Sequence, residues 1–119
     1  MDGRHFISAI KRTVRDSAID GTLSLLHHPP GRRPSADLLK QSDWYRSLSP
    51  QDRDMVSAVI ATAVDGALFG LLCVLDGVRA VEDGEIKGDF RLHYINGGVA
   101  VLNGPDAPFL HDLYNDPDV

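Results

Sequence analysis

Apolar residues recur every three or four positions through the first part of the chain, which is the period of an amphipathic helix. A first helix is predicted over residues 3–26, and its apolar stripe consists of Phe6, Ile10, Val14 and Ala18. Three prolines and a glycine within residues 29–34 then interrupt the helical pattern. A second helix is predicted from a cap at Ser35 or Asp37 to about Arg46, with Leu38, Leu39, Trp44 and Tyr45 turned inward.

The clearest helix start in the sequence is Ser49, which can cap a helix whose first position is Pro50. The predicted helix extends to Leu75 and is apolar on nearly all sides from Met55 onward. Such a stretch is long enough to span a membrane. However, Asp65 lies at its midpoint, where a carboxylate is costly, and no basic cluster flanks it. We therefore expect a long central buried helix and no membrane span.

Beyond Gly77 the apolar period changes to two, which is typical of strands. Strands are predicted over residues 78–81, 90–94 and 99–102, with a hairpin turn at Asn96-Gly97 between the last two. These three strands would form an antiparallel meander. A short C-terminal helix that includes Leu110 and Leu113 is expected to follow, capped by Asp106.

Helices that precede strands indicate the α+β class, and 119 residues fit a single domain over residues 1–119. The expected order is N-terminal helices, including the long central buried helix, then the three-stranded antiparallel meander and the short C-terminal helix. The one cysteine, Cys73, lies in an apolar run and has no intramolecular partner, which favours a reducing, cytoplasmic location.

The formal net charge of −5 is unevenly distributed. Residues 1–50 carry eight basic and five acidic side chains, a balance of +3, whereas residues 51–119 carry four and twelve, a balance of −8. An acidic half disfavours binding to nucleic acid or to an anionic membrane and suits a protein partner with a basic surface.

The sequence contains no recognisable catalytic set. It lacks a phosphate-binding glycine loop, a cysteine pair for zinc and a serine elbow, so no catalytic residue, metal or cofactor is predicted and the chain is not expected to be an enzyme. Asp65 stands out because a carboxylate in an apolar helix should be paired, hydrogen-bonded or functional. The possible functional residues are Asp65, His93, His111, Arg32 and Arg33.

Several segments resemble a small family of uncharacterised bacterial proteins. They are Trp44-Tyr45, residues 48–53, 67–72 and 75–78, and Leu110-His111-Asp112-Leu113. Some members of such groups are suspected immunity-type proteins, which neutralise a co-encoded toxin. The similarity covers most of the chain. Its motifs are structural, so the resemblance transfers no functional residue.

The leading hypothesis is a non-enzymatic protein-binding module, in the manner of an immunity or inhibitor protein that neutralises a basic partner or toxin. Its predicted contact residues are Glu82, Asp83, Glu85, Asp89, Asp106 and Asp112. One alternative is a small metal-dependent or acid–base hydrolase using His93, His111, Asp112 and Asp65. Another is a homodimeric structural protein packed through the helix face that bears Gly66 and Gly70.

Overall fold

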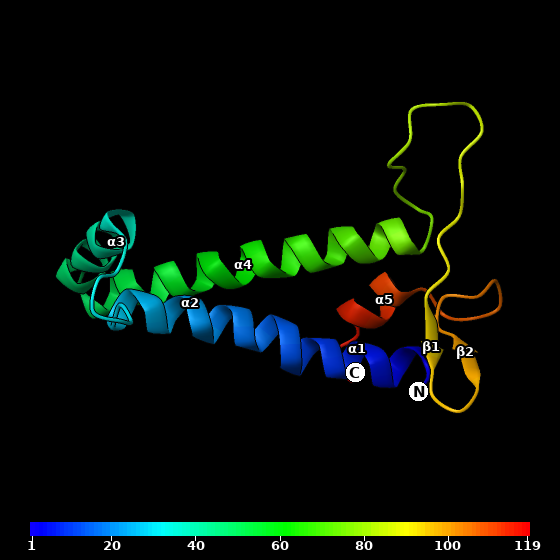
Figure 1. Cartoon of the computed structure of the whole chain (residues 1–119), viewed down its shortest axis with the longest axis horizontal. Coiled ribbons are helices and arrows are strands. Elements are labelled where there is room, and N and C mark those ends of the chain that lie inside the picture. The colour runs from blue at the N-terminus through cyan, green and yellow to red at the C-terminus, as the bar shows by residue number, and fades with distance from the viewer. The chain divides into compact units, whose positions relative to one another are not determined.

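The computed structural model describes residues 1–119 and is mostly helical, with one small antiparallel sheet (Figure 1). The elements in chain order are α1 (Gly3–Ile10), the π-helical η1 (Lys11–Asp16), α2 (Ser17–His27), α3 (Ala36–Ser47), α4 (Pro50–Leu75), β1 (His93–Ile95), β2 (Val99–Val101) and α5 (Leu110–Asn115). The chain divides into two compact units. We call Met1–Val14 with Gly66–Val119 the mixed unit, and Arg15–Asp65 the helical unit.

The helix starts follow local capping chemistry. The Asp2 carboxylate accepts hydrogen bonds from the backbone N and the ring Nδ1 of His5, at 2.9 and 2.8 Å, and these bonds lower the pKa of Asp2. Ser35 Oγ accepts from Leu38 N at 3.2 Å, so Ser35 rather than Asp37 caps α3. Ser49 Oγ accepts from Asp52 N at 3.1 Å, as predicted for the start of α4.

Helix α4 has the predicted bounds, but the expectation of a buried central helix is wrong. Only Gly70, Leu72 and Cys73 are buried, whereas Met55 and Val59 are exposed along its outer side. A helix that is apolar all round needs neighbours on every side, and this chain supplies too few elements to cover it. By length and composition α4 is the one helix that could cross a membrane, which is weak evidence because a soluble core helix meets the same criterion.

The predicted three-stranded meander is wrong, because the sheet has two strands. β1 pairs antiparallel with β2 in the register His93↔Val101, Tyr94↔Ala100 and Ile95↔Val99, around a turn with Gly97 at φ 66°. The expected first strand, residues 78–81, lies in an irregular segment between α4 and β1. All residues from 77 to 91 are exposed, so alternating side chains there have no surface to pack against.

The core of the mixed unit joins helices from both ends of the sequence. Its buried apolar members are Ile7 of α1, Leu72 of α4, and Leu110, Leu113 and Tyr114 of α5. α1 lies beside α5 (Figure 1). In η1, Lys11 donates from Nζ to the backbone oxygens of Asp116 and Val119, at 2.9 and 2.8 Å, which holds the C-terminal residues against this core.

A buried asparagine connects three segments of the mixed unit. Asn103 donates from Nδ2 to the carbonyl oxygens of Leu75 and Phe90, at 2.6 and 3.1 Å, and accepts at Oδ1 from Leu92 N at 2.7 Å. The amide therefore ties the end of α4 to the chain entering β1 and to the turn after β2. Leu75 O and Leu92 N would otherwise lack a partner at a partly buried site, whereas Phe90 O also accepts from Arg91 Nη1 at 2.8 Å.

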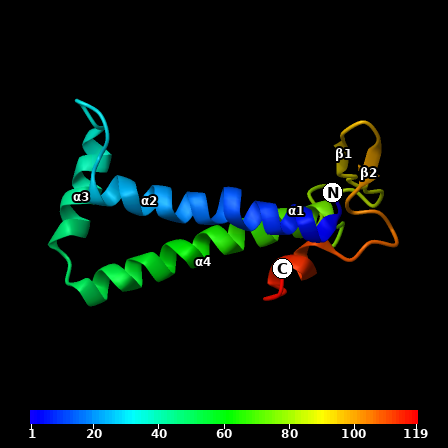
Figure 2. The ribbon, with the colours of Figure 1, turned by 90° about the horizontal axis from the view of Figure 1, so that it is seen from below.

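The helical unit has a small interior where α3 packs on α2 (Figure 2). Leu26, Ser42 and Tyr45 are its buried residues, and Ser42 Oγ donates to the Leu26 carbonyl at 2.6 Å. Tyr45 OH lies 3.2 Å from His27 Nε2. Trp44, predicted to face inward, is exposed. Adjacent positions on a helix differ by about 100°, so one aromatic side chain is buried and its neighbour is not.

We predict that Asn103→Ala lowers the free energy of unfolding by about 2–4 kcal/mol, because it removes three hydrogen bonds and leaves Leu75 O and Leu92 N without a partner. Urea denaturation followed by circular dichroism measures this loss. The exposed Asn115 at the end of α5 is the matched control, and Asn115→Ala should change stability by less than about 0.5 kcal/mol. Equal losses in the two variants would contradict the role assigned to Asn103.

Candidate functional site

The densest group of predicted contact residues lies on the irregular segment between α4 and β1. We call residues 77–91 the acidic loop, and it carries Glu82, Asp83, Glu85 and Asp89. Every residue of this loop is exposed, and it extends beyond the end of α4 (Figure 1). The structure therefore places four of the six predicted contact residues on one accessible segment.

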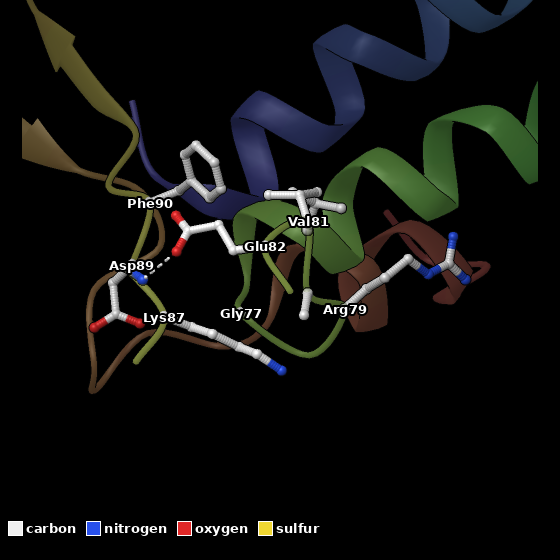
Figure 3. A pocket seen from close by; sticks show the side chains of 10 residues that line it. Gly77, Arg79, Val81, Glu82, Lys87, Asp89 and Phe90 are labelled. Atoms are coloured by element: carbon white, nitrogen blue, oxygen red, sulfur yellow. Dashed lines mark hydrogen bonds between the residues drawn. The ribbon is translucent and has the colours of Figure 1, made fainter. Parts of the chain in front are cut away.

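Contacts within the acidic loop and at its base give it a defined course. Glu82 Oε2 accepts from Gly88 N at 3.3 Å, which closes the loop's outer turn (Figure 3). At its base, Arg79 crosses Gly70 of α4 so closely that a Cβ at Gly70 would lie 2.6 Å from Nη1. Because Gly70 has no side chain, α4 leaves room at this position for Arg79 of the same unit. From the sequence, Gly70 was expected to let another helix pack closely on α4.

The other two predicted contact residues lie outside the acidic loop. Asp106 is exposed in the turn between β2 and α5, and it does not cap α5, contrary to the sequence prediction. Asp112 is exposed on α5, with Oδ1 3.4 Å from His111 Nε2. At the base of the loop, Asp89 and Asp76 line a polar cavity together with residues 103–105 and 107–109.

The cavities beside the acidic loop are too small for a typical ligand. The cavity that Glu82, Lys87 and Phe90 help to line has a volume of ≈ 100 Å³ (Figure 3), and the one at the base of the loop has ≈ 160 Å³. Pockets for small molecules usually measure about 300–1,000 Å³. The loop thus offers an open surface for docking, not an enclosure for a substrate.

A buried carboxylate that the sequence indicated only as a helix-end residue before Gly77 caps the last helix. The Asp76 side chain is 1% exposed, and its Oδ2 accepts from His111 N at 2.9 Å and lies 2.7 Å from His111 Nδ1. It takes the place of a local cap, since the N-cap residue Phe109 makes no side-chain hydrogen bond. A signal was present, because an aspartate at a helix C-terminus opposes the helix dipole and needs another reason to be there.

His111 is held on all sides by its neighbours. Phe109 stacks on its ring at a centroid distance of 5.2 Å, and Phe69 meets it edge-on at 5.7 Å. A carboxylate at Nδ1 fixes the ring orientation and favours a proton on that nitrogen. The Asp76–His111 pair therefore ties α5 to the end of α4.

Asp65 satisfies the expectation that a carboxylate in an apolar helix has a partner. Within the helical unit, its Oδ1 and Oδ2 accept from Arg15 Nε and Nη2 at 2.6 and 3.1 Å. This two-point geometry matches the planar guanidinium to the carboxylate. Arg15 belongs to the π-helical η1 and also donates from Nη1 to Asp16 at 2.9 Å. The pair explains the position of Asp65 without a catalytic role.

The remaining candidates are dispersed. His93 is exposed on β1, and Arg32 and Arg33 are exposed in the connection between α2 and α3. Asp65 and His111 each have a separate partner, Arg15 and Asp76. Nowhere do three or more His, Cys, Asp or Glu side chains gather in a geometry suited to holding a metal ion. Of the side chains suggested for a hydrolase, the structure brings together only His111 and Asp112, at 3.4 Å.

Comparison of the chain with protein-family models, curated proteins and solved structures finds no match. The resemblance to immunity-type proteins therefore stays a prediction.

We predict that Asp76→Ala lowers the free energy of unfolding by about 2 kcal/mol, because α5 loses its cap and His111 loses its buried partner. Asp112→Ala is the matched control, since it removes the exposed carboxylate on the other side of the same ring and should cost less than about 0.5 kcal/mol. Urea denaturation of both variants measures the difference. A larger loss in Asp112→Ala would show that the exposed carboxylate is the one that holds α5.

Proposed function

We propose that the protein is a non-enzymatic binding module that uses the acidic loop to dock on a partner protein with a basic surface. The observation that carries this proposal is Ile86, whose side chain is 93% exposed at the outer part of the loop, beside Glu85 and close in sequence to Asp83. An apolar side chain held this far into solvent is a natural contact for another protein.

The charges of the loop support a basic partner. Between residues 80 and 90 the chain carries Glu82, Asp83, Glu85 and Asp89 against one basic residue, Lys87. At the two ends of the loop, Arg79 crosses Gly70 and Arg91 lies 3.9 Å from Asp89, so their charges are directed to the base. The outer part is thus predominantly negative. Such a surface accelerates encounter with a positively charged partner and disfavours wrong ones.

A partner of this kind would be bound by an exposed loop with a central apolar contact and a charged rim, which is a common interface arrangement. An enzyme or toxin with a basic cleft has the complementary chemistry, and covering that cleft would inhibit it. An immunity or inhibitor role fits this arrangement. The small cavities beside the loop and the ion pairs that hold Asp65 and His111 in place favour binding over catalysis.

We predict that the purified protein, used as bait in lysate of its native cells at moderate salt, retains one stoichiometric basic partner. Asp83→Lys with Glu85→Lys, and separately Ile86→Asp, should each weaken that complex by at least about tenfold, because they remove the charge complementarity and the apolar contact. Isothermal titration with the identified partner measures both losses. Rising salt should weaken the wild-type complex and have less effect on the charge-reversed variant.

The matched control is Asp20→Lys with Asp54→Lys, which changes the net charge equally at exposed positions of the helical unit. It should leave affinity within about twofold of wild type. Equal weakening by the control and the loop variant would reduce the effect to net charge. Unchanged affinity in both loop variants would exclude the acidic loop as the contact surface.

A further inference from the structure

The two-stranded sheet of the mixed unit has an open edge on each side. β1 pairs with β2 alone, and no third strand lies beside either of them. Every residue of β1, from His93 to Ile95, is exposed. A strand at the edge of a sheet presents a row of backbone N–H and C=O groups with which a further strand can pair. The outer edge of β1 is therefore a surface with a defined pattern of hydrogen-bonding groups.

Hydrogen bonds at the two ends of the hairpin fix the direction in which each residue of β1 points. Next to the turn, Asn96 N donates to Gly98 O at 2.9 Å, and at the other end Leu102 N donates to Leu92 O at 2.8 Å. In an antiparallel pair, hydrogen-bonded and non-hydrogen-bonded positions alternate along the strand. Residues 92 and 96 therefore direct their backbone groups toward β2, and so does Tyr94 between them.

His93 and Ile95 direct their backbone groups the other way, to the outer edge of β1. None of the hydrogen bonds made by the loops and side chains around the sheet reaches the backbone N or O of either residue. Together the two residues offer two donors and two acceptors, repeated at roughly 6.6 Å, which is twice the rise of a strand. This spacing matches an extended peptide backbone.

The side chains beside this edge form an exposed apolar face of the sheet. His93 and Ile95 lie opposite Val101 and Val99, so the four side chains share one face. Ile95 is 73% exposed, Val99 64% and Val101 45%, whereas Leu102 on the opposite face is 3% exposed. One face of the hairpin thus packs on the core and the other is open. A strand added at the edge of β1 would extend the open face and cover part of Ile95.

The acidic loop leads directly into β1, and its charge determines which added strand is complementary (Figure 1). The basic side chain at the junction, Arg91, donates from Nη1 to Phe90 O at 2.8 Å and lies 3.9 Å from Asp89. The excess charge of the loop is therefore negative up to the start of the strand. An extended segment that pairs with β1 and continues toward the loop is favoured when it carries basic residues.

We propose that the partner adds a strand to the outer edge of β1, through an extended segment in which apolar residues alternate with basic ones. The inference rests on the proposed function, because it names the element of the partner that the acidic loop helps to bind. Backbone hydrogen bonds to His93 and Ile95 hold the segment, its apolar side chains pack beside Ile95, and its basic side chains face the acidic loop. In this mode of recognition the backbone supplies affinity and the side chains supply specificity.

A second copy of the chain is the other source of a strand for this edge. Pairing β1 of one copy with β1 of another would also bring two acidic loops together, and their like charges would repel each other. The charge of the loop therefore favours a basic partner over self-pairing. Self-pairing is an outcome that the experiments below distinguish.

The first experiment measures amide hydrogen exchange in the full chain by NMR, with a synthetic ten-residue peptide in which lysine alternates with valine. We expect the peptide to slow exchange at His93 and Ile95 by at least about tenfold, because a hydrogen-bonded N–H exchanges slowly. The amides of Val99 and Val101, on the other edge of the sheet, should exchange as in the free protein. The same peptide methylated at every backbone nitrogen is the control, since it keeps the side chains and loses the backbone donors.

The second experiment separates the backbone of His93 from its side chain. His93→Pro removes the outward N–H and leaves the hydrogen bonds between β1 and β2, as proline is tolerated at sheet edges. It should weaken peptide binding, measured by isothermal titration, by at least about tenfold, whereas His93→Ala should stay within about twofold of wild type. Val101→Pro is the matched control on the β2 edge, because Val101 lies opposite His93, and it should also stay within about twofold. Thermal melting followed by circular dichroism checks that the variants are equally folded.

Three outcomes would overturn the proposal. The first is unchanged exchange at His93 and Ile95 with the peptide at millimolar concentration. The second is an equal effect of His93→Pro and Val101→Pro on binding, which would place the contact elsewhere. The third is protection of the same amides in the concentrated protein alone, which would assign the edge to a second copy.

Failure of strand addition is distinguishable from failure of the proposed function. If the partner retained from lysate is weakened by the acidic-loop variants and not by His93→Pro, docking through the loop stands and strand addition is wrong. If His93→Pro weakens that complex and the acidic-loop variants do not, the edge of β1 is the contact and the role of the loop is wrong.

Discussion

The length and apolarity of α4 are the constraint from which the rest of the structure follows. Twenty-six helical residues run from Pro50 to Leu75, and apolar side chains occur on nearly all sides of the helix. A chain of this size has few elements with which to cover them, so Leu72 and Cys73 near one end are buried while Met55 and Val59 near the other are exposed. The two ends of α4 are consequently packed differently. Near Leu72 the helix packs within the chain, and near Met55 its apolar side chains stay exposed.

Two polar side chains hold the structure around the C-terminal end of α4, where Leu72 and Cys73 are buried. Asp76 and Asn103 both act where α4 stops, and each replaces a missing regular element by hydrogen bonds to backbone groups. Asp76 supplies the cap that α5 lacks, and Asn103 links Leu75 to the irregular chain that leads into β1. Because these contacts hold its base, the acidic loop can extend into solvent without secondary structure of its own. Binding surfaces on loops that a rigid base positions are common in proteins.

The local rules predicted the helices well and the long-range packing poorly. Ser35 and Ser49 marked the starts of α3 and α4 because a cap is a contact between residues three apart. Four acidic residues of the loop were predicted from charge alone, and the exposure of Ile86 was not predicted, because a single exposed apolar residue has no periodic signal. In the sequence Asp76 was notable only because an aspartate at a helix C-terminus opposes the helix dipole. Its partner His111 lies 35 positions away along the chain.

The sequence by itself determined the starts of α3 and α4, the hairpin turn at Gly97 and the charge asymmetry between the two halves, since each depends on neighbouring residues or on composition. Only the tertiary structure decided which apolar residues are covered. Residues 78–81 have the composition of a strand but are exposed and pair with neither strand of the sheet, and Trp44 has the character of a core residue but faces solvent beside buried Tyr45. Burial depends on which distant segments come together, and periodicity along one segment carries no information about its neighbours in space.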